Sequence, residues 1–200
     1  MMICISRLQE YTITPAQMNL LFKSRIIWRD IATWLRAYLV YVFLNSDPEL
    51  KQAVIDNLNS LPKAFGNVLR IYFGDVAADE YTVLLSNYIK ILTSLTDAIK
   101  NGDTNAIDEY TNQLYQNINE RVNFLSTVNP FWEKNTVSNF INNYTKMTID
   151  EIYTFSNKNY KRNIDLFKGI LTYADSMGDY IADGLLKYLT YSSREPRIPE

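Results

Sequence analysis

The stretch that decides the fold is RIIWRDIATWLRAYLVYVFL, residues 25–44. Its apolar side chains recur at the three- and four-residue spacing of an α-helix. Three arginines and one aspartate lie inside this apolar run. On a helical wheel Arg25, Arg29 and Arg36 fall within about 40° of one another and form one stripe, and Asp30 lies about 100° away. The run therefore predicts a long helix that is charged along one line and buried all round beyond Arg36.

Glycines and prolines, six of each, punctuate the chain where helices are expected to begin and end. Thr14, Pro15 and Gln17 have the pattern of a capping box that opens the first helix. Thr148 and Glu151 form a second expected capping box. Gly102 suits the left-handed position that ends a helix. The predicted helices span about residues 14–45, 48–61, 62–74, 75–100, 104–127, 134–146, 149–157 and 160–188.

No stretch alternates apolar and polar residues between hairpin turns, so strands are not expected. The sequence predicts an all-α fold, an up-and-down bundle of four long helices with short helices in two connections. The bundle is predicted to be a single domain over residues 14–190. An N-terminal segment, residues 1–13, precedes it, and a flexible tail, residues 191–200, follows it.

Composition narrows the function. The chain has 200 residues. Its net charge of −2 argues against general nucleic-acid binding, which needs a basic face. Histidine, the usual general base near neutral pH and the commonest transition-metal ligand, is absent, and the single cysteine, Cys4, cannot form a thiolate zinc cluster. We therefore expect no cofactor. The most apolar run, residues 31–44, is about half a membrane span, so we expect no membrane span and a cytoplasmic protein.

Catalytic motifs are also missing from the sequence. It contains no Gly-rich phosphate loop and no GxSxG, and a Ser-His-Asp arrangement is impossible without histidine. Carboxylates cluster in three early helical turns, at Asp79-Glu80, Asp108-Glu109 and Asp150-Glu151. Such clusters can hold a hard cation, but helix capping and the helix dipole explain them more simply.

The last predicted helix carries Asp175, Asp179 and Asp183 at four-residue spacing, which places them on one flank. A solvated stripe explains this spacing, and pairing with arginines of a neighbouring helix is the alternative. If the arginines are enclosed, a partner is needed because a buried unpaired charge is costly. We then expect Arg29 or Arg36 to pair with one of these aspartates.

Several stretches carry a family resemblance. They are WRDIATWLR (28–36), YFGDVAADEYTVLLSNYI (72–89), NPFW (129–132), MTIDEIYTF (147–155) and MGDYIADGL (177–185). Together they resemble an uncharacterised bacterial family of helical bundles, over about residues 20–189, some members of which are labelled acetylglutamate kinase. Kinases of that name resemble an α/β amino-acid kinase fold with Gly-rich phosphate loops, and this chain offers neither feature.

The resemblance implies a metal or polar-ligand site in the bundle core of many relatives, built from histidines on four helices. This chain has other residues at those positions, namely Ile31, Tyr88, Asn143 and Tyr173. Other polar positions match the family pattern, and with the arginine stripe they define a candidate ligand-binding site in the core. Its residues are Arg29, Asp30, Arg36, Asp179 and Asp183.

Two hypotheses for the function follow from these observations. The first is a non-catalytic bundle that acts by binding or as a structural protein, with self-association or a protein partner. The second is a small-ligand or metal-binding bundle, or a descendant that has lost its histidine ligands. No residue constellation supplies a nucleophile with its base, so an enzyme is the least expected outcome.

Overall fold

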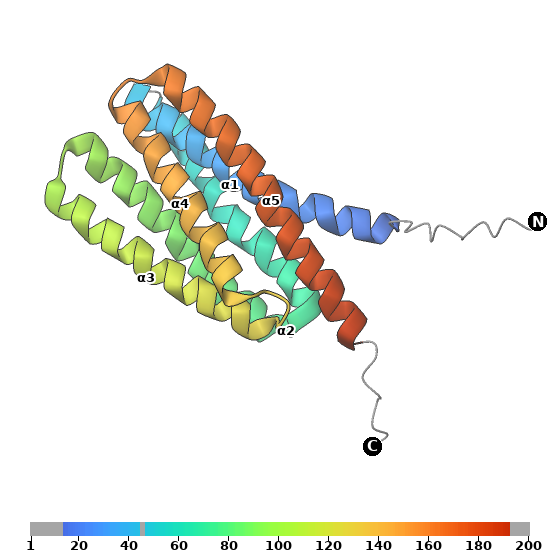
Figure 1. Cartoon of the computed structure of the whole chain (residues 1–200). Coiled ribbons are helices and arrows are strands. Elements are labelled where there is room, and N and C mark those ends of the chain that lie inside the picture. Colours follow the sequence, from blue (N-terminus) through green and yellow to red (C-terminus); the bar gives the residue numbers. More distant parts are fainter. Residues whose placement is uncertain (1–13, 45–46, 193–200) are drawn as a thin grey trace, which may run out of the picture.

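The computed structural model describes residues 14–44 and 47–192, and this part of the chain is an all-α bundle without strands (Figure 1). The predicted fold class is thus confirmed. Within the described residues no helix is both long enough and apolar enough to cross a membrane. The helices are α1 (Pro15–Leu44), α2 (Pro48–Asn101), α3 (Thr104–Val128), α4 (Lys134–Ser156) and α5 (Tyr160–Ser192).

The two ends of the chain were predicted to lie outside the domain. The N-terminal segment, residues 1–13, lies outside the described residues. The predicted tail began at residue 191, but α5 continues to Ser192, and residues 193–200 also lie outside the described residues. The last helix is therefore about one turn longer than its predicted end near residue 188.

Helix α2 reverses direction at Gly74, where φ is 80° and ψ is −178°. The rings of Phe65 and Tyr81 lie on either side of this point, with centroids 5.0 Å apart. A straight helix would hold these two residues about 24 Å apart, so the halves of α2 fold back against each other, as Figure 1 shows. Glycine readily adopts a positive φ, which explains why the reversal falls at this residue. The predicted helix end at Gly74 is confirmed.

Two other predicted boundaries are wrong. Pro62 was expected to start a new helix, but it lies buried inside the first half of α2. The packing of that face overrides the local cost of a proline within a helix. Thr148 was expected to cap a helix, yet its Oγ1 donates to the Tyr144 carbonyl oxygen at 2.9 Å within an unbroken α4. The expected capping box of Thr148 and Glu151 therefore does not form.

The capping signals elsewhere are confirmed. The backbone N–H of Thr14 donates to Gln17 Oε1 at 2.9 Å, and the N–H of Gln17 donates to Thr14 Oγ1 at 3.2 Å. These reciprocal bonds are a capping box that satisfies two donors at the start of α1. Gly102 ends α2 with φ at 69°, in the left-handed region that favours glycine.

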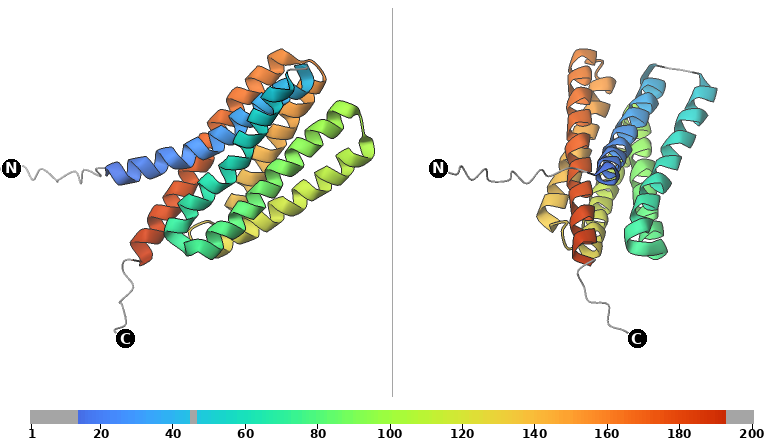
Figure 2. Two further views of the ribbon diagram at one scale, coloured as in Figure 1. Left: turned by 180° about the vertical axis from the view of Figure 1, so that it is seen from behind. Right: turned by 90° about the vertical axis from the view of Figure 1, so that its right-hand side faces the viewer.

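In the bundle, α1 lies against α5 and α2, α3 lies against α2, and α4 lies against α5 and α3 (Figures 1 and 2). Trp28 of α1 is 1% exposed and packs edge-on against Phe65 of α2 and Tyr144 of α4, with centroids 5.7 and 5.6 Å away. This aromatic cluster fixes the middle of the core. The N-terminal end of α1 points away from the bundle in Figure 1 and in the left view of Figure 2.

Helices α1 and α5 cross at an unusually close approach. A Cβ atom added at Gly178 of α5 would lie 2.6 Å from both the Cα and the N of Arg25 in α1. Real Cβ atoms essentially never come so close to backbone, so only glycine allows this crossing. The crossing brings the charged side chains on either side of Gly178 close to those of α1.

Candidate functional site

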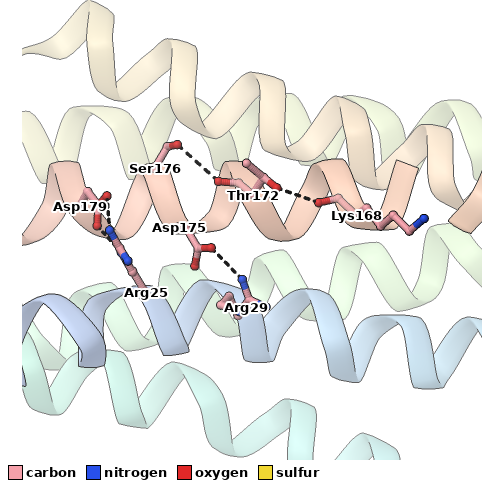
Figure 3. Close-up of polar contacts among 7 residues, drawn as sticks. All are labelled: Arg25, Arg29, Lys168, Thr172, Asp175, Ser176 and Asp179. Atoms are coloured by element: carbon pink, nitrogen blue, oxygen red, sulfur yellow. Dashed lines mark hydrogen bonds and ion pairs between the residues drawn. The ribbon is translucent and has the colours of Figure 1, made fainter. Parts of the chain in front are cut away.

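Two ion pairs join α1 to α5 (Figure 3). Both Nε and Nη2 of Arg25 donate to the Asp179 carboxylate, with Nη2 2.7 Å from Oδ2. Arg29 Nη1 donates to Asp175 Oδ2 at 2.7 Å. The predicted pairing of Arg29 with an aspartate of the last helix is confirmed. These four side chains are 32% to 42% exposed, so the pairs lie at the surface and do not line a core cavity.

The other predicted aspartates do not join these pairs. Asp183 bonds Lys187 of its own helix, with Nζ 2.6 Å from Oδ2, and both side chains are more than half exposed. Asp30 is half-buried, and its carboxylate makes no hydrogen bond to another described residue. Burial raises the pKa of Asp30, and the neighbouring Arg29 opposes that rise. Of the predicted site residues, only Arg29 and Asp179 therefore take part in the α1–α5 ion pairs, and they pair with Asp175 and Arg25 rather than with each other.

Arg36 has a partner that the sequence reading missed. Its Nη1 lies 2.5 Å from Glu151 Oε1 of α4 and 2.7 Å from Asn163 Oδ1 of α5. The guanidinium also lies over the rings of Phe155 and Phe167, 5.3 and 4.5 Å from their centroids. Arg36 thus ties α1 to α4 and α5 through an ion pair, an amide and two aromatic faces.

Glu151 is the buried member of this cluster, with 1% of its side chain exposed. Burial raises its pKa to about 7, and the hydrogen bond and charge of Arg36 oppose the rise. The Asn163 side chain donates to the Glu151 carbonyl at 3.2 Å and to Thr154 Oγ1 at 3.0 Å. Asn163 therefore holds this part of the α4 backbone against α5, while Arg36 bonds the carboxylate, whose enclosure moves its titration towards neutral pH.

Arg121 of α3 is the most unusual residue of the core. It is 1% exposed, and it forms no ion pair within the described part of the chain. Its guanidinium lies over Tyr88 at 4.5 Å, Trp28 at 5.6 Å and Tyr81 at 5.9 Å from the ring centroids. Its Nη2 donates to the Tyr81 hydroxyl at 3.4 Å, and Nε and Nη1 have no acceptor. Aromatic faces replace the carboxylate that a buried cation normally needs.

Hydroxyl groups continue this polar layer into α4. Tyr88 shares a hydrogen bond with Thr145 Oγ1 at 3.2 Å, and the Tyr144 hydroxyl donates to the Trp28 carbonyl at 3.0 Å. Burial raises the pKa of Tyr88 despite the opposing charge of Arg121. Burial also raises the pKa of Tyr144, so both tyrosines stay neutral, with their hydroxyls in hydrogen bonds and their rings packed in the core.

Sequence reasoning missed Arg121 and Glu151 for different reasons. Arg121 follows Leu114 and Ile118 and precedes Leu125 at four- and three-residue spacing, which is the core stripe of α3. That position was a usable signal for a buried charge. Glu151 was assigned to a capping box, and its burial depends on α1 and α5, which no local pattern reveals.

The four positions at which relatives were expected to carry histidine differ in their burial. Asn143 Nδ2 donates to the Tyr173 hydroxyl at 3.2 Å in an exposed part of the α4–α5 contact. Ile31 and Tyr88, by contrast, are buried in the core. Within residues 14–44 and 47–192, no group of three or more cysteine, aspartate or glutamate side chains lies close enough to hold a metal ion.

Two surface ion pairs link α1 to α5, and Arg36 links α1 to α4 and α5. The contacts of these polar residues thus hold helices together. No nucleophile lies beside a general base among these contacts. Compared with family models, with curated proteins and with solved structures, the chain matches none.

Proposed function

We propose that this protein is a non-catalytic helical bundle that acts by binding, and that it self-associates through the N-terminal end of α1. The observation that carries the proposal is the N-terminal arm, residues 15–23. None of its residues is buried, whereas Ser24 is fully buried and buried residues recur in every later turn of α1. The arm is about 14 Å of helix. Leu20 still packs against the core, and the start of α1 projects beyond the rest of the bundle (Figure 1).

An apolar stripe made of Met18, Phe22 and Ile26 runs along the arm and into the next turn of α1. The residues are four positions apart and share one helical face. Phe22 is 50% exposed and Ile26 is 52% exposed, although both are large apolar side chains. A stripe of this kind along a projecting helix is typical of a helix–helix interface.

A second copy of this chain is the partner that fits the arm. Two antiparallel copies of one stripe meet in a self-complementary contact, which is how twofold dimers form. Two of the charges beside the stripe do not oppose such a contact, because Asp179 neutralises Arg25 and Asp175 neutralises Arg29. Lys23 is exposed and forms no ion pair within the described residues, so each arm brings one positive charge to the contact.

Sedimentation equilibrium of the full chain tests the proposal, over about 1 to 100 μM protomer. We expect a reversible dimer for the wild type. The double variant Phe22→Ser/Ile26→Ser should be monomeric over the same range, because it removes the two most exposed apolar groups of the stripe. Both positions are solvent-facing in the monomer, so circular dichroism should show an unchanged helix content.

Ile71 and Val76 provide the matched control. They are 78% and 82% exposed, and they flank the reversal of α2, on a different helix from the arm. The variant Ile71→Ser/Val76→Ser should dimerise like the wild type. A monomeric wild type, or a dimer that survives loss of Phe22 and Ile26, would overturn the proposed interface.

A further inference from the structure

A cleft of about 470 Å³ lies between the second half of α2 and α3. This volume is within the range of roughly 300–1,000 Å³ that is usual for small-molecule sites. We propose that the cleft binds a neutral, hydroxyl-rich small molecule of the saccharide class. The site lies on different helices from the N-terminal arm and does not depend on self-association.

Asn117 of α3 is the buried polar residue of this cleft. It is 3% exposed, and its Nδ2 donates to the Leu84 carbonyl oxygen of α2 at 2.9 Å. Its Oδ1 has no hydrogen-bond partner within the described residues. An enclosed acceptor without a donor is destabilising, and nearly all such groups in folded proteins find a partner. Because Oδ1 is itself enclosed, a ligand hydroxyl in the adjoining cleft can supply that donor once the Asn117 side chain turns towards it.

The other side chains of the cleft indicate the class of ligand. Three more amides, those of Asn87, Gln113 and Gln116, line it. An amide presents both donors and an acceptor, as a sugar hydroxyl does, so amides match an array of hydroxyl groups. Tyr110 and Ile91 add an apolar strip against which the C–H face of a sugar ring can pack.

The charges of the cleft favour a neutral ligand. Lys90 of α2 and Glu120 of α3 both line it, and neither side chain forms an ion pair in the part of the chain described here. Their charges cancel, so the cleft as a whole attracts neither anions nor cations strongly. Each remains available to bond a hydroxyl group as a charged donor or acceptor, which is stronger than a neutral hydrogen bond.

A second cleft of about 360 Å³ adjoins the first and shares Asn87 and Lys90 with it. It lies between the two halves of α2 and adds Asn59, Ser86 and Thr93. The two clefts together offer amides and hydroxyls on both sides of Lys90. This continuity accommodates a ligand of two linked rings, with the ring junction near Lys90.

Nuclear magnetic resonance tests the proposal on the full-length, ¹⁵N-labelled protein. Glucose, galactose, N-acetylglucosamine and the disaccharide maltose are titrated separately, with glycine as a zwitterionic comparison. We expect at least one sugar to give saturable shifts confined to residues 55–59, 86–94 and 110–120. Gln116→Ala should weaken that binding about fivefold, the effect of losing one hydrogen bond.

Matched variants separate the cleft from the general surface. Asn119→Ala removes an exposed amide of the same helix outside the cleft, and Lys63→Ala removes an exposed lysine of α2. Both should bind like the wild type, whereas Lys90→Ala should bind more weakly. The proposal is overturned if no sugar saturates these shifts or if glycine saturates them equally. Equal effects of Gln116→Ala and Asn119→Ala would also overturn it.

Discussion

Gly178 of α5 lies directly against the backbone of Arg25 in α1, where an added Cβ would come within 2.6 Å of the Arg25 Cα. We expect Gly178→Ala to force the two helices apart and to lower the free energy of unfolding by roughly 2–4 kcal/mol. Urea denaturation followed by circular dichroism measures this change.

Gly169 of the same helix is the matched control for Gly178. A Cβ at Gly169 would lie 3.2 Å from the end of the flexible Met147 side chain, which can move. Gly169→Ala should therefore be neutral, or stabilising by up to about 1 kcal/mol through helix propensity. Equal losses at the two glycines would contradict the close crossing of α1 and α5.

The raised pKa of Glu151 predicts a pH dependence of stability. Because its pKa rises from 4.5 to about 7 on folding, the folded state holds this proton more tightly than the unfolded state. The stability contributed by the protonated carboxyl is complete below about pH 4.5 and falls as the pH rises through about 7. Glu151→Gln should remove this fall, which is on the order of 3 kcal/mol.

Denaturation of both proteins between about pH 5 and about pH 8 tests the role of Glu151. The difference between wild type and Glu151→Gln should change steadily over that interval. Glu133 is the control, because hydrogen bonds from Thr136 and Asn135 hold its pKa below its usual value. Its contribution is lost only at lower pH, so Glu133→Gln should leave the slope between pH 5 and 8 unchanged. Parallel curves for wild type and Glu151→Gln would refute the assignment.

Arg121 carries a buried charge without a carboxylate partner, so we expect an apolar residue of similar length to be tolerated there. Arg121→Met should stabilise the fold by about 1 kcal/mol, because it removes a desolvated cation and two unbonded nitrogen donors. Arg121→Ala should instead cost roughly 2–4 kcal/mol through the cavity it leaves. Thermal and urea unfolding distinguish the two, and a loss above about 2 kcal/mol for Arg121→Met would mean that the aromatic contacts dominate.

The Arg25–Asp179 pair should contribute little, because both side chains are more than a third exposed. We expect a double-mutant cycle with Arg25→Ala and Asp179→Ala to give a coupling of about 0.5–1 kcal/mol that weakens in high salt. This is smaller than the strong effect expected for an enclosed pair. A coupling above about 2 kcal/mol, insensitive to salt, would contradict the observed exposure.

Local signals in the sequence predicted the local features of the fold. Thr14 with Gln17, Gly74 and Gly102 each mark a helix end through chemistry confined to a few neighbouring residues. The arginine stripe and the four-residue spacing of the aspartates predicted that Arg29 or Arg36 would pair with one of the three aspartates, and the Arg29–Asp175 pair is one of those combinations.

The errors in the prediction arise where distant packing decides the structure. Pro62 remains within a helix because its buried face belongs to the core. Glu151 is part of the core because Arg36 and Asn163 reach it from two other helices. The α2–α3 cleft depends on which helices become neighbours after α2 folds back, so its composition was not visible along the chain.

The crossing of α1 and α5 also bears on how the chain folds. Each helix otherwise packs largely beside its neighbours in sequence, so most contacts can form over short loops and at high rates. Arg25 and Asp179, in contrast, are 154 residues apart. Joining them requires the closure of almost the entire chain, which has the largest entropy cost of any contact described here. During synthesis the α1–α5 crossing therefore cannot form until α5 has been made, whereas the contacts of α1 with α2 and of α2 with α3 do not have to wait for α5.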